Sequence, residues 1–207
     1  MLKVFIVGGG INYETMFEDM GWEITEQIDD ADLVQFTGGS DVSPHLYGEE
    51  THPRTHSSLL RDTGEIKVYE DCLRQGKPMA GICRGGQFLH VMSGGKLWQH
   101  IPGHAIMHTH SAWSYDKETV LHVTSTHHQA MRYSKDVGEV LLWAAAHGAH
   151  QHMSDGMVVA VEVTHNVESV YHMESKSFCY QPHPEFEQGE CREYYFDKLL
   201  ELFGLWA

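Results

Sequence analysis

The sequence predicts an α/β fold, a three-layer sandwich in which helices cover both faces of a central, mostly parallel β-sheet. In the first half of the chain, short apolar runs alternate with amphipathic stretches, which is typical of strands joined by crossover helices. The 207 residues suit one domain, and a hydrophobic share of 42% is enough for an ordinary core. We therefore expect a single domain over residues 1–207.

Apolar spacing and glycines place the elements of the first half. The predicted elements are strands at 2–7, 33–36 and 79–82 and helices at 12–20, 61–75 and 85–92. Gly21 follows the first helix, where glycine is common because it tolerates a left-handed backbone. In the second helix, Ile66, Tyr69 and Leu73 lie at helical spacing.

The second half is richer in strands. Strands are predicted at 120–124, 140–145, 157–163, 169–173 and 178–181, followed by a helix at 191–203. Residues 103–117 have no clear hydrophobic period and are expected to form a loop.

Charge and hydropathy exclude some classes of function. The chain has 29 acidic and 14 basic residues and a formal charge of −15, which disfavours binding to nucleic acid. It has no run of 18 apolar residues that could span a membrane. Its first residues lack the features of a signal peptide, so a cytoplasmic protein is expected.

The cysteines indicate a nucleophile rather than a scaffold. Cys72, Cys83, Cys179 and Cys191 include no Cys-x-x-Cys pair, which argues against a disulfide framework or a zinc ribbon. Cys83 lies in Gly-Ile-Cys-Arg-Gly, between a predicted strand and a predicted helix. This is the nucleophile-elbow pattern with cysteine in place of serine, and the helix N-terminus favours a thiolate. The alternative interpretation is a buried structural cysteine beside a tight turn.

A base and its orienting acid can be found near the C-terminus. A thiol nucleophile needs a base, and His183 and Glu185 follow a predicted strand two residues apart. Pro182 and Pro184 favour an extended backbone, in which residues i and i+2 point to one side. Glu185 can then hold one ring nitrogen while the other faces Cys83. The alternative is a solvated histidine in a proline-rich turn.

With these residues the chain resembles the class I glutamine amidotransferase superfamily over nearly its full length. The supporting segments are Thr-Gly-Gly-Ser-Asp-Val-Ser-Pro at 37–44, Arg-Asp-x-x-Glu at 61–65, Gly-Ile-Cys-Arg-Gly-Gly-Gln at 81–87, Gly-Gly-Lys-Leu-Trp-Gln at 94–99, Ser-Thr-His-His-Gln-Ala at 125–130 and His-Pro-Glu at 183–185. Several of them are similar to the γ-glutamyl-γ-aminobutyrate hydrolase-like (peptidase C26-like) branch. The sequence departs from that branch at Gly86, Thr124 and Phe186, where Met, Asn and Trp are common.

The resemblance implies a flavodoxin-like fold and hydrolysis of a γ-glutamyl amide. Cys83 would be the nucleophile that forms a glutamyl thioester, His183 its base and Glu185 the partner of that base. Glutamate would be released with ammonia or an amine. The further residues that the resemblance implies are the backbone amides of Gly38, Gly39 and Arg84 for an oxyanion hole, and Gln87, Ser125 and His127 for substrate binding.

Three functions remain open from the sequence. The first is a free-standing hydrolase that acts on glutamine or a γ-glutamyl amine without a partner. The second is a glutaminase subunit that supplies ammonia to a separate synthetase or ligase. The third is a non-enzymatic descendant of the fold, which the intact Cys-His-Glu set disfavours.

No cofactor and no metal are expected. Residues 8–10 are glycines after the first strand, but Tyr13 stands where a dinucleotide fingerprint needs its third glycine. Two groups of histidines lack the spacing of a known zinc site and are predicted to be solvated in loops. These groups are His104, His108 and His110, and His147, His150 and His152.

Overall fold

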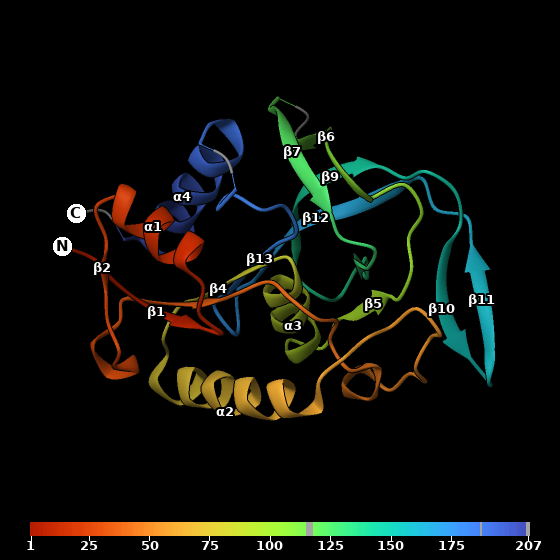
Figure 1. The fold of residues 1–207 in the computed structure, drawn as a ribbon, viewed down its shortest axis with the longest axis horizontal. Coiled ribbons are helices and arrows are strands. Elements are labelled where there is room, and N and C mark those ends of the chain that lie inside the picture. The colour runs from red at the N-terminus through yellow and green to blue at the C-terminus, as the bar shows by residue number, and fades with distance from the viewer. Residues whose placement is uncertain (115–117, 187, 206–207) are drawn as a thin grey trace.

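The computed structural model describes residues 1–114, 118–186 and 188–205, without the side chains of residues 106–108. Helices cover both faces of one long sheet (Figure 1). The helices are α1 (Ile11–Asp19), α2 (Leu59–Gln75), α3 (Arg84–Met92) and α4 (Glu190–Phe203), with short 3-10 helices η1 (Ile28–Asp30) and η2 (Pro44–Tyr47). The strands are β1 (Lys3–Val7), β2 (Glu23–Ile24), β3 (Leu33–Phe36), β4 (Met79–Ile82), β5 (Lys96–Trp98), β6 (Ala105–Ser114), β7 (Val120–Thr126), β8 (Ala130–Arg132), β9 (Glu139–Ala145), β10 (His150–Ser154), β11 (Met157–Val161), β12 (His165–His172) and β13 (Ser177–Tyr180).

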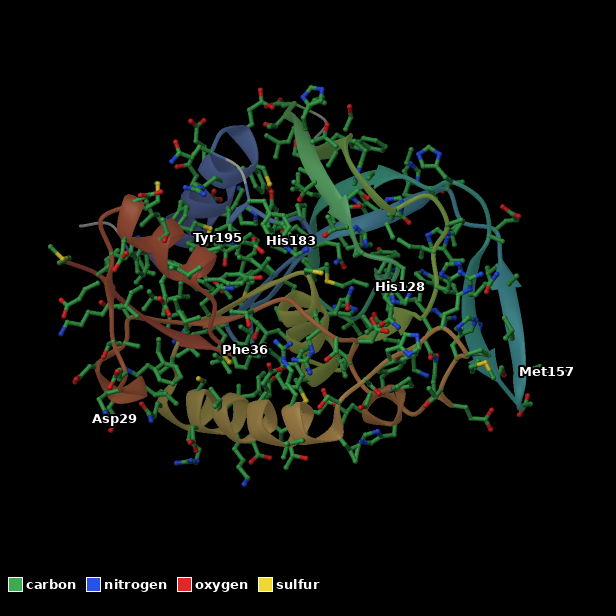
Figure 2. The ribbon with its side chains drawn as sticks, in the orientation of Figure 1. Asp29, Phe36, His128, Met157, His183 and Tyr195 are labelled. Atoms are coloured by element: carbon green, nitrogen blue, oxygen red, sulfur yellow. The ribbon has the colours of Figure 1, made fainter. Side chains whose placement is uncertain are left out.

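The main sheet has a parallel part and an antiparallel part. Its strands lie in the order β2-β1-β3-β4-β13-β12-β9-β6-β7. Neighbours from β2 to β13 run parallel, and neighbours from β13 to β7 run antiparallel. Because β4 and β13 are parallel neighbours, the residues that follow them emerge at the same edge of the sheet. β10 and β11 form a separate hairpin, with Met157 at its tip (Figure 2).

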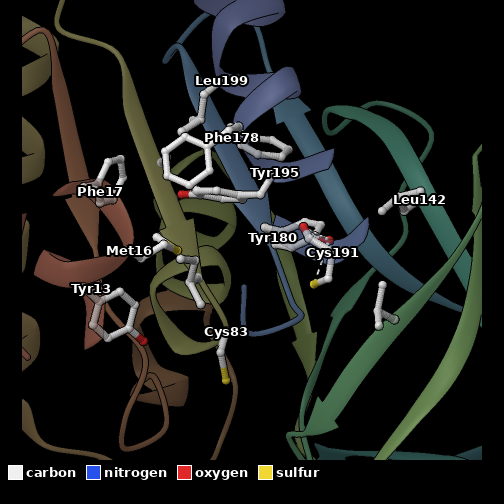
Figure 3. Close-up of a cluster of buried hydrophobic side chains, with 14 of the residues drawn as sticks. Tyr13, Met16, Phe17, Cys83, Leu142, Phe178, Tyr180, Cys191, Tyr195 and Leu199 are labelled. Atoms are coloured by element: carbon white, nitrogen blue, oxygen red, sulfur yellow. Dashed lines mark hydrogen bonds between the residues drawn. The ribbon is translucent and has the colours of Figure 1, made fainter. Parts of the chain in front are cut away.

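Two apolar layers separate the sheet from its helices, which confirms the predicted three-layer α/β fold. The layer shown in Figure 3 packs α1 and α4 against one face, and the other packs α2 and α3 against the opposite face. The helices contribute Met16, Phe17, Tyr195 and Leu199 to the first layer and Tyr69, Cys72, Phe88 and Leu89 to the second. In the described part of the chain, no helix is long and apolar enough to cross a membrane.

The predicted loop at 103–117 is wrong for most of its length. Residues 105–114 form β6, which pairs with β7 and β9, and residues 115–117 lie outside the described part. The strand was missed because polar residues interrupt its apolar alternation; His110, for example, turns toward the carboxylate of Glu168. The short strands β2, β5, β8 and β10 were not predicted either. The strand predicted at 157–163 forms, as β11, but outside the main sheet.

Candidate active site

Cys83 occupies the sharp turn between β4 and α3, at the edge of the apolar layer, with its sulfur directed away from the other side chains (Figure 3). Its φ of 52° and ψ of −113° are rare for a residue with a side chain. A hydrogen bond of 2.7 Å from its N–H to the carbonyl of Tyr180 holds the turn. A Cβ on Gly81 would lie 2.3 Å from the carbonyl carbon of Gly85, and one on Gly85 would lie 2.2 Å from the carbonyl oxygen of Phe36. The glycines therefore let helix and strand approach closely enough to present the thiol at a helix N-terminus.

His183 follows β13 and is fixed from three sides. Its Nδ1 lies 2.6 Å from Oε1 of Glu185. Its backbone N–H donates to Oγ1 of Thr124 on β7 at 2.7 Å. The ring of Phe186 stacks on the imidazole with centroids 4.6 Å apart. Nε2 is buried and has no hydrogen-bond partner among the residues that the structure describes.

The loop after β3 meets both side chains at Gly38. A Cβ built on Gly38 would lie 3.3 Å from Cε1 of His183 and 3.7 Å from Cβ of Cys83. The Gly38 N–H donates to the hydroxyl of Tyr13 on α1 at 2.9 Å. Of the amides predicted for an oxyanion hole, that of Gly38 is thus engaged by a side chain that sequence reasoning did not assign to the site.

A buried ionic network lies under this loop. The guanidinium of Arg84 pairs with the carboxylates of Asp62 and Glu65 on α2, and all three side chains are buried. Beside them, Arg61 bonds Glu65 at 2.7 Å and donates to the carbonyl oxygen of Thr37 at 2.9 Å. The network ties the loop that starts at Thr37 to α2 and α3. Removing one partner would leave an unpaired buried charge, which is strongly destabilising.

Charge around the imidazole favours its protonated form. Burial alone would lower the pKa of His183, but the negative charges of the Cys83 sulfur and the Glu185 carboxylate outweigh burial and raise the pKa to about 10. Burial, with the charge of Glu185 second, raises the pKa of Tyr13 far above its ordinary value. The Tyr13 hydroxyl therefore stays neutral beside Gly38.

The three residues predicted to bind substrate are buried and bonded within the protein. Gln87 donates from Nε2 to the carbonyl of Gln129 at 3.1 Å. Ser125 donates from Oγ to the carbonyl of His104. Nδ1 of His127 lies 2.8 Å from that same Gln129 carbonyl. Their substrate-binding roles stay predictions.

The prediction that the grouped histidines are solvated in loops is wrong in two respects. His108 and His110 lie on β6, and His150 and His152 lie on β10. Two of the histidines whose side chains the structure describes are also buried. His104 is 2% exposed and His150 is fully buried. His104 directly precedes β6 and His150 lies on β10, and both bond to Asn166 on β12. His147 is exposed as expected, and the side chain of His108 lies outside the described part.

Comparison with known proteins identifies the family. The family model of Peptidase C26 matches residues 6–185, a span that contains both segments of the site. The chain belongs to the Peptidase C26 family. A glutamine amidotransferase-like relative, YvdE of Lactococcus lactis, is 32% identical over 91% of this chain and 84% of its own length.

Solved structures confirm the fold of this Peptidase C26 member. A candidate GMP synthase component of Thermoplasma acidophilum matches with a TM-score of 0.62 and 16% identity, over 99% of this chain and 94% of that one. PurLQS of Thermotoga maritima matches with a TM-score of 0.58 and 17% identity, over 97% of this chain and 98% of that one. At such identities the likeness shows the class I glutamine amidotransferase fold and nothing further.

Proposed function

We propose that the protein is a cysteine amidohydrolase that cleaves the γ-glutamyl amide bond of glutamine or of a γ-glutamyl amine. The main support is the convergence of Cys83, Gly38 and His183 at one edge of the sheet, where the charge of the Cys83 sulfur helps to raise the pKa of His183. A histidine ring nitrogen beside a cysteine sulfur on a strained turn is the arrangement that activates a nucleophile. Membership of Peptidase C26, with a glutamine amidotransferase-like relative, supports amide hydrolysis.

In the resting site Nε2 of His183 already holds the proton of the Cys83 sulfur, so the first step starts from a thiolate–imidazolium pair. The thiolate attacks the carbonyl carbon of the amide, a C–S bond forms, and the carbonyl π electrons move to oxygen. The oxyanion accepts hydrogen bonds from the backbone amides of Gly39 and Arg84, the latter in the first turn of α3. Tyr13 holds the Gly38 amide and so sets the position of the loop.

In the second step, the tetrahedral intermediate expels the amine. The C–N bond breaks as the imidazolium of His183 gives its proton to the leaving nitrogen, and a glutamyl thioester remains on Cys83. His183 then takes a proton from water, and the water oxygen attacks the thioester carbon. The C–S bond breaks, glutamate leaves and loses its acid proton to solvent, and the thiolate–imidazolium pair is restored. Glu185 holds Nδ1–H throughout, so that Nε2 exchanges the protons.

The proposal is tested by assaying glutamate release from glutamine and from a panel of γ-glutamyl amines. We expect Cys83→Ala to lower the rate by about 10³-fold or more. Cys72→Ala is the matched control, because it removes a buried thiol on α2 away from the site. A glutamine-like chloroketone should alkylate Cys83, as read by peptide mass. Unchanged turnover in Cys83→Ala, or no turnover and no alkylation in folded wild type, would contradict the proposal.

A second function is to supply ammonia to a separate synthetase or ligase. The fold neighbours support it, because they include PurLQS and a candidate GMP synthase component. The two functions differ in the same assay. Release from γ-glutamyl amines supports the free-standing hydrolase, whereas slow release from glutamine alone, with Cys83 still alkylated, supports the ammonia-supplying role.

A further inference from the structure

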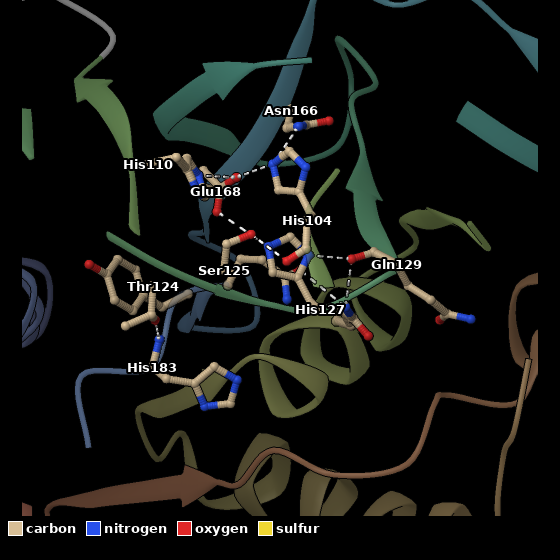
Figure 4. Close-up of polar contacts among 12 residues, drawn as sticks. His104, His110, Thr124, Ser125, His127, Gln129, Asn166, Glu168 and His183 are labelled. Carbon is tan, nitrogen blue, oxygen red and sulfur yellow. Dashed lines mark hydrogen bonds and ion pairs between the residues drawn. The ribbon is translucent and has the colours of Figure 1, made fainter. Parts of the chain in front are cut away.

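A carboxylate and three imidazoles gather where β6, β7 and β12 meet, in a cluster that the proposed reaction does not use (Figure 4). Glu168 lies on β12 and is fully buried. His104 directly precedes β6, His110 lies on it, and His127 directly follows β7. Oε1 of Glu168 is 3.3 Å from Nε2 of His110 and 3.7 Å from Nε2 of His104, and its Oε2 is 3.9 Å from Nε2 of His127.

Two of these atoms are not satisfied by the protein. Oε2 of Glu168 and Nε2 of His127 are buried and have no hydrogen-bond partner within the described chain. Within the described residues, Glu168 forms ion pairs with histidines and with no lysine or arginine. A buried carboxylate is costly unless a positive charge or a metal compensates it. The cluster therefore needs a positive charge, which a bound metal ion or a protonated imidazole would supply.

The histidine tautomers suit a metal. Nδ1 of His104 lies 3.3 Å from the carbonyl oxygen of Pro102, and Nδ1 of His127 lies 2.8 Å from that of Gln129. A carbonyl that accepts Nδ1–H leaves Nε2 as a lone pair, which is the usual arrangement of metal-binding histidines. In both residues Nε2 is the atom nearest Glu168.

The spacing of three of the four residues suits a small tetrahedral ion after a modest contraction, whereas His127 lies outside that group and faces the other carboxylate oxygen of Glu168. Three donor atoms lie within 4.8 Å of one another, one from each of His104, His110 and Glu168. Around a tetrahedral Zn²⁺ such atoms lie roughly 3.4 Å apart. Asn166 now donates to Nε2 of His104 at 2.8 Å, and binding would replace this hydrogen bond by a metal bond. Calcium and magnesium are excluded by the donor set, since they prefer oxygen ligands throughout.

We propose that His104, His110, Glu168 and His127 bind one Zn²⁺ ion. Four protein ligands leave no open position, so the ion is structural rather than catalytic. It would fasten β6 and β7 to β12, whose Glu168 carbonyl accepts the N–H of Gln181 at 2.8 Å, two residues before His183. The ion thus acts on the strands that position the candidate active site.

The test uses the full-length protein stripped with a chelator and titrated with Zn²⁺ alone. We expect one ion per chain by calorimetry and by metal analysis, with a raised melting temperature. Substitution with Co²⁺ should give the intense visible bands of a four-coordinate ion. Less than one ion per chain, or the weak bands of six-coordinate Co²⁺, would overturn the proposal.

Paired variants locate the ion. His110→Ala removes a ligand that is 19% exposed and should weaken Zn²⁺ binding by about tenfold or more. His122→Ala removes an exposed histidine of β7 and should leave binding unchanged. Equal affinity in wild type and His110→Ala would place the ion elsewhere and refute the assignment. If metal-free His110→Ala does not fold, the stoichiometry and the Co²⁺ bands of the wild type decide the question.

Discussion

His183 lies between two acidic neighbours, and this decides its charge at working pH. An ordinary imidazole loses its proton near 6.5, whereas the neighbouring Cys83 sulfur and Glu185 carboxylate outweigh burial and raise the pKa of His183 to about 10. The ring therefore stays protonated through neutral pH in the resting site. In the proposed reaction this proton goes to the leaving amine, so activity should persist to alkaline pH and fall as His183 deprotonates.

Glu185→Gln tests this assignment at a single residue. The amide keeps the shape of the side chain but removes a negative charge, so it disfavours the imidazolium and lowers the pKa of His183. We expect the alkaline limb of kcat/KM to move down by roughly 1–3 pH units, the usual effect of a nearby opposite charge. Glu18→Gln, an exposed change of the same charge on α1, is the control and should leave the limb in place. If the alkaline limb of kcat/KM does not move in Glu185→Gln, the limb reports a group other than His183.

Single residues also show how far sequence reasoning reaches. Cys83, His183 and Glu185 could be selected from sequence because each lies in a short local pattern and the two patterns support each other. Tyr13 could not, because its bond to Gly38 joins positions 25 residues apart and depends on how α1 packs. The sequence offered one signal, an aromatic residue in place of a fingerprint glycine, and it was used only to exclude a dinucleotide.

At the scale of elements, the helices were placed to within two residues, whereas one long strand was missed. Helix α1 ends where Gly21 adopts a φ of 78° and the Trp22 N–H donates to the carbonyl of Phe17. The glycine itself is the signal, and it can be recognised from neighbouring residues alone. Strand β6 has no such signal, because its inward histidine is matched by Glu168 from a strand far along the chain. Hydrophobic periodicity cannot reveal a strand whose inward side chains are polar and pair with another strand.

The close approach of α3 to β3 gives a prediction about stability. In Gly85→Ala the new Cβ would lie 2.2 Å from the carbonyl oxygen and 2.6 Å from the carbonyl carbon of Phe36, main-chain atoms that cannot swing aside. We expect a loss of about 3 kcal/mol or more in the free energy of unfolding, measured in urea. Gly64→Ala makes the same change on α2, where the Cβ meets nothing within 4 Å, and should instead stabilise by about 0.5–1 kcal/mol. Equal stability of the two variants would mean that the elbow is not as tight as described.

For the whole molecule, the order of strands joins the two halves of the chain. β13 comes near the end of the sequence yet lies between β4 of the first half and β12 of the second. The candidate site has the same origin, with Cys83 after β4 and His183 after β13. Neither half has a complete sheet without the other, which is the physical reason to expect one folding unit over residues 1–207.

That expectation can be tested with probes at the two ends of the sheet. Trp22 packs beside Phe17 and Phe196 at the parallel end, and Trp143 lies on β9 beside Tyr133 in the antiparallel part. In protein labelled with 5-fluorotryptophan, the two residues give separate fluorine resonances, assigned with Trp22→Phe and Trp143→Phe. If β13 couples the parallel and antiparallel parts of the sheet, the two resonances lose native intensity at the same urea concentration. Different midpoints would mean that the antiparallel part opens alone, and His183 would then lose its hydrogen bond to Thr124 on β7 while the parallel strands stay folded.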